Sequence, residues 1–128
     1  MGEAELRLAT EEIGWLTTVA PDGRPQTSPV WFLWHDGAVW IASEPSATKV
    51  ANLAGNAAAS FHLEGAGPGD LVVTLEGTAT VGGTVPSAYG EKYAAGLERM
   101  ATSAAAYLED FAATVRFVPS RVRMFRSV

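Results

Sequence analysis

The sequence contains no cysteine and only two histidines, His35 and His62. The absence of cysteine excludes disulfides, thiolate nucleophiles and thiolate metal ligands. The histidines lie far apart without a His-x-x-x-His spacing, so we expect no metal site. There is also no Gly-x-Ser-x-Gly motif and no glycine-rich phosphate loop of the Walker or Rossmann type. We therefore expect no catalytic side chain, and any chemistry would come from a bound cofactor.

Positive charge is also scarce, since nine Lys and Arg residues face 14 acidic ones, for a formal net charge of −5. This balance, without any basic run, argues against nucleic-acid binding. No apolar stretch reaches bilayer length, so no membrane span is expected. The first residues, MGEAELRLATEE, are acidic and unlike a secretory signal. The sequence therefore predicts a cytoplasmic protein.

The length of 128 residues fits one domain, which we place over 1–128. The composition, 48% hydrophobic and 18% charged, is that of a globular protein. It is slightly apolar for this size, which is compatible with an interface to another chain.

Alternating apolar and polar residues predict six strands. Asp22-Gly23 and Asp36-Gly37 are typical of tight hairpin turns, because their residues accept positive φ angles. Pro119 predicts a bend in the last strand, because proline cannot donate to a fully paired ladder. The predicted strands cover 14–20, 25–35, 38–43, 58–64, 71–81 and 115–125.

The remaining segments predict short helices and one loop. Helical spacing of apolar residues covers 3–12, 87–100 and 103–113, and residues 65–70 form a turn-rich loop. A further helix follows Ser46 as its cap and ends at Gly55 in the left-handed conformation. Its inward face is predicted to be Ala47, Val50, Leu53 and Ala54, while Thr48, Lys49 and Asn52 face elsewhere. The predicted fold is mainly β (α+β), a six-stranded antiparallel barrel with short flanking helices, because closure removes exposed edges.

The start of that helix, Ser46-Ala47-Thr48-Lys49, is a candidate anion site. Free backbone N–H groups and the helix dipole attract a phosphate, to which the Thr48 hydroxyl and the Lys49 ammonium would add. Taken alone, the segment favours the simpler interpretation that Ser46 caps the helix and Lys49 is solvated.

Four segments in order resemble a known family. They are Gly14-Trp15-Leu16-Thr17-Thr18-Val19, Pro21-Asp22-Gly23-Arg24-Pro25-Gln26-Thr27-Ser28-Pro29-Val30-Trp31-Phe32, Lys49-x-x-Asn52-Leu53 and Leu75-Glu76-Gly77-Thr78-Ala79. Together they resemble the pyridoxamine-phosphate-oxidase-like split β-barrels of the FMN-binding type. Within this class they are similar to the deazaflavin-dependent branch found in actinobacteria. The resemblance covers nearly the whole chain.

The resemblance implies a homodimer with cofactor grooves between the subunits, and coenzyme F420 or alternatively FMN as the cofactor. The residues implied around the ring are Thr27, Ser28, Pro29, Val30 and Trp31. Those implied around the ribityl phosphate are Ala42, Ser43, Thr48, Lys49 and Asn52. Trp31, Trp34 and Trp40 have an alternative role as core or dimer aromatics.

The sequence departs from this family at two positions, Ala51 and Ala58, where many relatives carry arginine. Fewer cations then face the phosphate. Near the end of the sequence, Arg121, Arg123 or Arg126 could reach across a dimer, or could form an ordinary solvated strand face. Glu76 could pair with an arginine across the interface.

The leading functional hypothesis is an F420-dependent oxidoreductase that transfers hydride between the cofactor and a small unsaturated or quinone-like substrate. An FMN-dependent enzyme of the same fold is the nearest alternative. A carrier that binds flavin, deazaflavin or haem without turnover is another, and a structural dimer without cofactor is the last.

Overall fold

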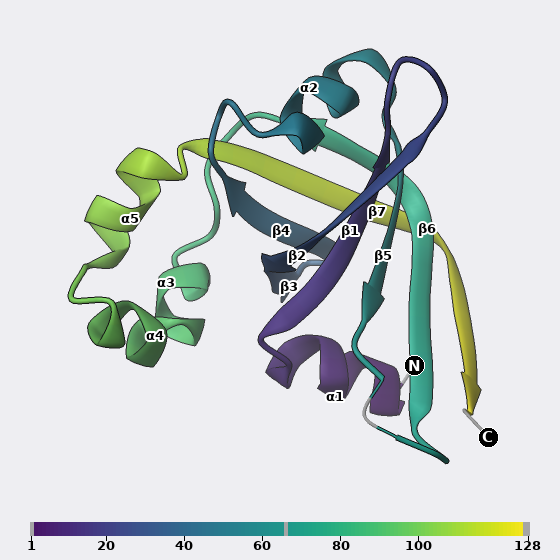
Figure 1. Ribbon diagram of the computed structural model, residues 1–128. Coiled ribbons are helices and arrows are strands. Elements are labelled where there is room, and N and C mark those ends of the chain that lie inside the picture. The colour runs from purple at the N-terminus through teal and green to yellow at the C-terminus, as the bar shows by residue number, and fades with distance from the viewer. Residues whose placement is uncertain (1, 66, 127–128) are drawn as a thin grey trace.

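The computed structural model describes residues 2–65 and 67–126, and Ala66 of the predicted 65–70 loop lies outside these ranges. In this part of the chain, seven antiparallel strands curl into a half-open barrel flanked by short helices (Figure 1). The elements are α1 (Gly2–Thr10), β1 (Ile13–Val19), β2 (Pro25–Trp31), β3 (Leu33–His35), β4 (Ala38–Ser43), α2 (Thr48–Gly55), β5 (Ala58–Leu63), β6 (Leu71–Val81), α3 (Ala88–Lys92), α4 (Ala94–Arg99), α5 (Ala104–Asp110) and β7 (Ala113–Arg126).

The strands are ordered β2-β1-β5-β6-β7-β4-β3, so β2 and β3 are the two edges of the sheet. Within the described part of the chain, β2 pairs only with β1, with Pro25 opposite Val19 and Pro29 opposite Trp15. Curling brings β2 close to β4, although no ladder joins them in the described residues. The barrel is therefore split along the line between β2 and β4.

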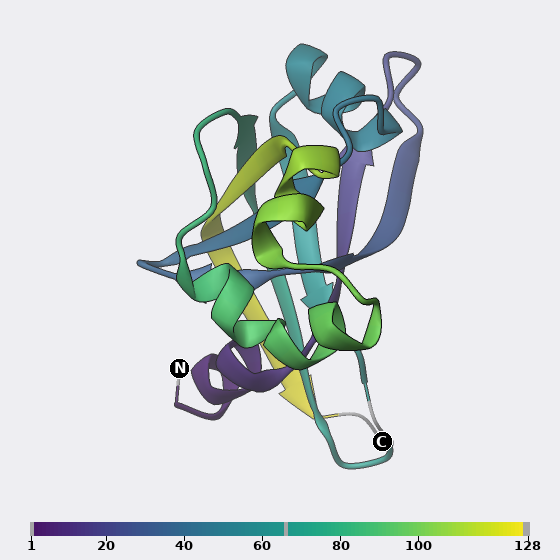
Figure 2. The ribbon, with the colours of Figure 1, turned by 90° about the vertical axis from the view of Figure 1, so that its left-hand side faces the viewer.

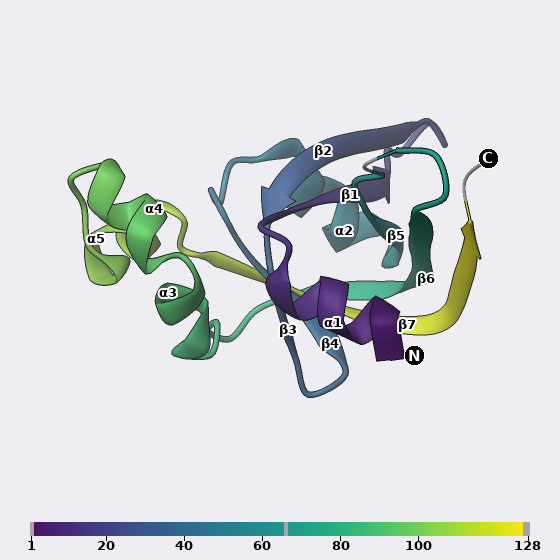
Figure 3. The same ribbon diagram turned by 90° about the horizontal axis from the view of Figure 1, so that it is seen from below.

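The inner face of the sheet forms the main core. Alternation along β6 is the clearest case, since Val73, Leu75 and Ala79 are buried between polar residues. Fully buried Phe61 contacts the rings of Phe32 and Phe117, at centroid distances of 4.9 and 6.3 Å. α1 closes one end of this core with its buried Ala4 and Leu8, and α2 covers the other (Figure 1 and Figure 3).

The helices α3, α4 and α5 form a separate layer against the outside of β2, β3 and β4 (Figure 2). Their apolar residues make a second buried cluster with strand residues Leu33 and Ala42. At the centre of this cluster lie Tyr89, Tyr93 and Leu97. In the described ranges, no helix is long and apolar enough to span a bilayer.

The barrel prediction is confirmed, but the predicted strand 25–35 is wrong as one element, because Phe32 divides it into β2 and β3. The backbone of Phe32 bonds to side chains instead of to a strand. Its N–H donates to the Tyr93 hydroxyl at 2.7 Å, and its carbonyl accepts from Lys92 Nζ at 2.7 Å. The Tyr93 hydroxyl is also 2.7 Å from the Glu12 carbonyl oxygen and 2.8 Å from that of Phe32. One tyrosine thus fixes the break.

Replacing Tyr93 by phenylalanine should reduce the free energy of unfolding by about 1–3 kcal/mol, because it leaves the buried N–H of Phe32 without its hydrogen-bond partner, while the Phe32 carbonyl keeps its bond from Lys92. Urea denaturation measures this change. Tyr89→Phe is the matched control, because Tyr89 is buried in the same cluster and its hydroxyl is not one of the partners of Phe32. Equal stability losses in the two variants would contradict the role given to Tyr93.

Lys92, which bonds to Phe32 at the break between β2 and β3, should make the stability of the protein depend on pH. Its Nζ lies 3.8 Å from the centroid of the Phe32 ring, and burial lowers the pKa of Lys92 from 10.5 to about 8, against the opposing effect of Glu12 and Glu11. The folded protein therefore releases the Lys92 proton near pH 8, whereas the unfolded chain keeps this proton up to about pH 10.5. Through Lys92, stability should rise as the pH increases from about 8 towards 10.5.

Urea denaturation of the wild type and Lys92→Met between about pH 7.5 and 9.5 tests this effect. The wild type should gain stability relative to the variant across this range. Parallel pH profiles would mean that Lys92 does not titrate there. The comparison cancels contributions from the other titrating groups.

The predicted bend in the last strand is confirmed at Pro119. The β6–β7 register shifts between Glu76 and Gly77, where Gly77 lies opposite Pro119, and β7 curves beyond this point (Figure 1). A Cβ on Gly77 would overlap the carbonyl oxygen of Val118. The two strands approach closely here because residue 77 has no side chain.

Two details of the predicted helix after Ser46 are wrong. α2 begins at Thr48 after Ala47, and the cap residue makes no side-chain hydrogen bond. Gly55 is the last helical residue, and the chain leaves the helix through extended Asn56 rather than through a left-handed glycine. The Asn56 N–H bonds to the Asn52 carbonyl at 2.9 Å, which satisfies this end of the helix.

Other boundaries differ by a few residues. The predicted helix 87–100 is two short helices, α3 and α4, and the predicted helix 103–113 ends at Asp110. Ser103 caps α5 by accepting from the Ala106 N–H at 3.1 Å. Only Gly23 has a positive φ in the first predicted turn, whereas Asp36 and Gly37 both do in the second. The second turn is thus the tighter hairpin form.

Candidate functional site

A cavity of about 410 Å³ opens at the split in the barrel. β2 and β4 form its sides, the segment leading into α2 forms one end, and α4 and α5 cover the other. Its lining residues are Pro29, Val30, Trp31, Ala42, Ser43, Glu44, Ala47, Lys49, Met100, Tyr107 and Phe111. The site thus combines three parts of the chain, within residues 29–31, 42–49 and 100–111.

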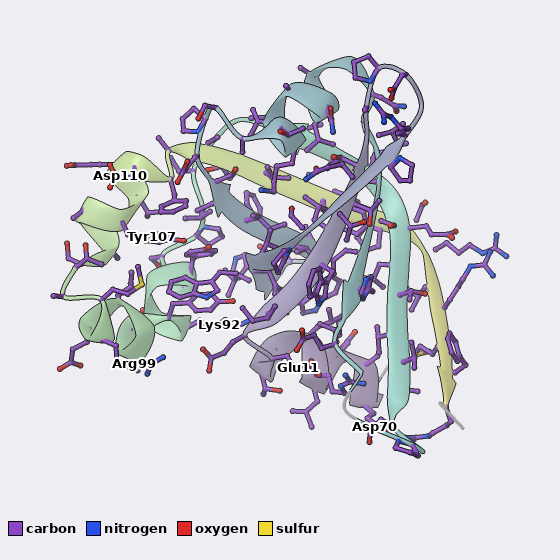
Figure 4. All side chains as sticks on the ribbon, in the orientation of Figure 1. Glu11, Asp70, Lys92, Arg99, Tyr107 and Asp110 are labelled. Atoms are coloured by element: carbon purple, nitrogen blue, oxygen red, sulfur yellow. The ribbon has the colours of Figure 1, made fainter. Side chains whose placement is uncertain are left out.

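Aromatic rings form the apolar wall of the cavity. Trp31 stacks on Tyr93 at 4.3 Å and on Tyr107 at 5.4 Å, and Tyr107 stacks on Phe111 at 4.2 Å. Figure 4 shows Tyr107 pointing from α5 towards the strands. Burial raises the pKa of Tyr107, so its phenol stays protonated at neutral pH. Flat apolar surfaces of this kind suit a planar ring.

The opposite part of the cavity is polar and comes from the β4–α2 connection. Ser43 is buried, and its Oγ donates to the Glu44 carbonyl at 3.1 Å. Lys49 lies in the first turn of α2 and is half-buried. Burial lowers the pKa of Lys49, while the Glu44 carboxylate acts in the opposite direction. One cation and one anion therefore share this region.

Six of the ten residues predicted for the cofactor line this cavity, namely Pro29, Val30, Trp31, Ala42, Ser43 and Lys49. The other four do not. Thr27 is exposed, and its hydroxyl is 2.7 Å from that of Thr17. Thr48 is exposed at the start of α2.

Asn52 is buried, although we expected it to face away from the core beside Thr48 and Lys49. Its Nδ2 donates to Thr18 Oγ1 at 3.0 Å, and this bond joins α2 to β1. The predicted inward face of the helix is wrong in part as well, because Ala54 is exposed and Leu53 is buried. Asn52 thus orients the helix that carries Lys49.

Ser28 provides a test of whether the site fits a ligand. It precedes Val30 by two residues, on the same face of β2. Its Oγ is buried and has no hydrogen-bond partner among the described residues. Buried hydroxyls are normally paired. Ser28 itself does not line the cavity, but a polar ring edge that extends past Val30 would satisfy this hydroxyl, and the residues fit a cofactor with such an edge.

Sequence reasoning missed five lining residues: Glu44, Ala47, Met100, Tyr107 and Phe111. Tyr107 and Phe111 were expected only as the apolar face of a helix. Their spacing of four residues signals a common face, but not what that face covers. Glu44 carried no signal, because an acidic residue before a helix is common.

Several charged residues proposed for other roles are paired within the chain. Arg123 Nε lies 3.4 Å from Glu76 Oε2, and Arg126 Nη2 lies 2.8 Å from Glu3 Oε1. Arg121 faces Glu76 across the β6–β7 ladder and is exposed. No cluster of three or more His, Asp or Glu side chains suited to a metal ion occurs in residues 2–65 and 67–126.

The family model for pyridoxamine 5'-phosphate oxidase matches residues 2–124. No curated protein matches the sequence. Three solved structures are similar in fold. An F420 reductase is 22% identical, with a TM-score of 0.70, over 93% of this chain and 94% of the other. The haem storage protein HutZ from Vibrio cholerae is 18% identical, with a TM-score of 0.68, over 98% of this chain and 92% of the other. The FAD-binding protein from Mycobacterium smegmatis is 18% identical, with a TM-score of 0.63, over 98% of this chain and 94% of the other.

The match to the family model extends over nearly all of the sequence, and the similar structures share the curled antiparallel barrel. The resemblance drawn from the four sequence segments is therefore confirmed at the level of family and fold. This chain belongs to the pyridoxamine 5'-phosphate oxidase family.

Proposed function

We propose that the chain is an oxidoreductase that uses the deazaflavin coenzyme F420 to reduce a small unsaturated or quinone-like compound. The observation that carries this proposal is the cavity at the barrel split, which has an aromatic wall at one side and Lys49 at the other. Such a site matches a flat ring joined to a phosphate. The similarity to an F420 reductase supports the choice of cofactor.

When bound, the deazaflavin supplies the hydride chemistry, and the chain's own residues bind and orient it. We assign Pro29, Val30, Trp31 and Ala42 to the ring, with Ser28 Oγ at a polar ring edge. Apolar contacts on the ring exclude water and fix its position, which is the main contribution a protein makes to hydride transfer.

The phosphate is assigned to Lys49 and Ser43, with Thr48 at the point where the tail leaves the cavity. A half-buried ammonium gives a stronger charge-assisted bond than an exposed one, because less water competes for it. We assign Thr27 and Asn52 a supporting role, since both already hydrogen-bond within the chain.

We further propose that two copies associate and complete the cofactor groove. This is supported by the exposed apolar side chains on β7, namely Val118, Val122, Met124 and Phe125. Soluble monomers rarely leave such a group uncovered. Arg121, exposed on the same strand, is the arginine best placed to contribute to a partner's site. Sedimentation at several protein concentrations tests the association.

Titration of the purified protein with F420 and, in parallel, FMN tests the assigned cofactor. Ligand fluorescence reports binding, and a quinone acceptor reports turnover. F420 binding with turnover supports the proposal. Preference for FMN would make the protein an FMN-dependent enzyme of the same fold, and no binding to either would contradict both assignments.

A carrier without turnover is a second candidate, and the size of the cavity favours it. A volume of about 410 Å³ is near the lower end of the range for small-molecule sites, roughly 300–1,000 Å³. This leaves little space for a substrate beside the ring. The similarity to a haem storage protein and an FAD-binding protein also supports this function. Tight binding without acceptor reduction distinguishes a carrier.

A further inference from the structure

Glu44 is an unexpected residue in a cavity assigned to a phosphate. It lies in the connection between β4 and α2, and its backbone carbonyl accepts from Ser43 Oγ at 3.1 Å and from the Ala47 N–H at 3.0 Å. These two bonds fix the backbone of Glu44 at the cavity. Glu44 lines the same cavity as Lys49.

The carboxylate and the ammonium do not neutralise each other directly. Within the described ranges, neither Glu44 nor Lys49 belongs to an ion pair. Glu44 nevertheless affects the electrostatics of the site, because it raises the pKa values of both Lys49 and Tyr107. Both charges therefore remain available to a ligand and act on it together.

The combination of one cation, Lys49, with one anion, Glu44, has different consequences for phosphomonoesters and phosphodiesters. A phosphomonoester such as that of FMN carries close to two negative charges above pH 7, because its second pKa is about 6. A phosphodiester carries only one. Lys49 attracts both, but repulsion by Glu44 grows with each added charge. With one cation beside one anion, the second charge of a monoester has no partner among the described residues that line the cavity.

We propose that Glu44 is a specificity-determining residue that makes this cavity favour a singly charged phosphodiester over a doubly charged phosphomonoester. This inference rests on the proposed function, and deepens it, because the phosphate of F420 is a diester and that of FMN a monoester. Glu44 thereby contributes to the choice between the two cofactors.

The test uses three ligands that share one ring: riboflavin, FMN and the methyl ester of FMN. They carry no phosphate charge, about two and one at about pH 8. The same series is made with the deazaflavin ring. Dissociation constants are measured by fluorescence for the wild type and for Glu44→Gln, which keeps the shape of the side chain and removes its charge.

In Glu44→Gln, binding of the monoester should tighten about tenfold and binding of the methyl ester about threefold, with no change for the ligand without phosphate. Glu5→Gln is the matched control, since it removes the same charge from an exposed position on α1. That variant should leave all three constants within about twofold of the wild type.

The possible failures are distinguishable. In one outcome, every ligand binds, and the ratio of the monoester and methyl-ester dissociation constants is the same in Glu44→Gln as in the wild type. This outcome would overturn the inference and leave the proposed function intact. Equal tightening for all ligands, riboflavin included, would also overturn it, because the effect would not depend on the phosphate. If neither ring series nor F420 binds the wild type, the proposed function fails, and this inference fails with it.

Discussion

Replacing Lys49 by alanine should weaken the binding of a phosphate-bearing cofactor by about 1.5–3 kcal/mol, which is roughly a 10- to 150-fold increase in Kd. The reason is local. Among the described residues that line the cavity, Lys49 is the only basic one, and its partial burial protects the contact from competing water. Titration followed by fluorescence measures the change. The same ring without its phosphate should bind the variant and the wild type equally.

Two further variants separate the contact from general electrostatics. Lys49→Arg keeps the charge and should recover most of the affinity. Arg24→Ala removes a positive charge from the exposed turn between β1 and β2, where Arg24 pairs with neighbouring Asp22. It should leave binding unchanged. If Lys49→Ala binds as well as the wild type, the phosphate does not contact Lys49.

Replacing Phe61 by alanine should reduce the free energy of unfolding by about 3–5 kcal/mol. Phe61 is fully buried in β5 and contacts two other core rings, Phe32 and Phe117. It also packs over Gly14 of β1, where a Cβ would overlap its ring. Truncation would leave a cavity between strands that cannot close the gap without losing their pairing. Urea denaturation measures the loss.

Phe125→Ala provides the matched control, because this phenylalanine is 57% exposed near the end of β7. In a monomer it should change stability by less than about 1 kcal/mol. If β7 contributes to a dimer, the effect of Phe125→Ala should depend on protein concentration, whereas that of Phe61→Ala should be large at every concentration. A small effect of Phe61→Ala would contradict the packing described above.

Much of the sheet could be predicted from the sequence because its signals are local. The Asp36-Gly37 turn adopts the positive φ angles that these residue types favour, and it fixes the β3–β4 hairpin. The alternation in β6 identifies its buried face, because a strand repeats every two residues. Each of these signals lies within about ten residues of the element that it predicts.

The division of the strand at Phe32 could not be predicted in this way. The local sequence from 25 to 35 alternates like one strand, but the partner that breaks it, Tyr93, lies 61 residues further along the chain. The burial of Asn52 has a similar origin, since its partner Thr18 is 34 residues away. A polar residue is predicted to face water unless its distant partner is known.

The residues of the candidate site could likewise be predicted only in part. Residues of β2, β4 and α2 could be identified because the resemblance to the family implied them as cofactor contacts, and six of them line the cavity. The aromatic cover from α5 could not, because Tyr107 and Phe111 have the pattern of any amphipathic helix. Only the packing of the helical layer against Trp31 brings them to the cavity.

The two prolines of β2 have a consequence for how the protein behaves at high concentration. An edge strand with free N–H groups is a template on which strands of other molecules can add, which leads to fibres and precipitates. Pro25 and Pro29 have no N–H groups to offer, and they lie on the edge strand that borders the split. The split in the barrel can therefore stay accessible to small molecules, while the prolines of β2 hinder the addition of strands from other molecules.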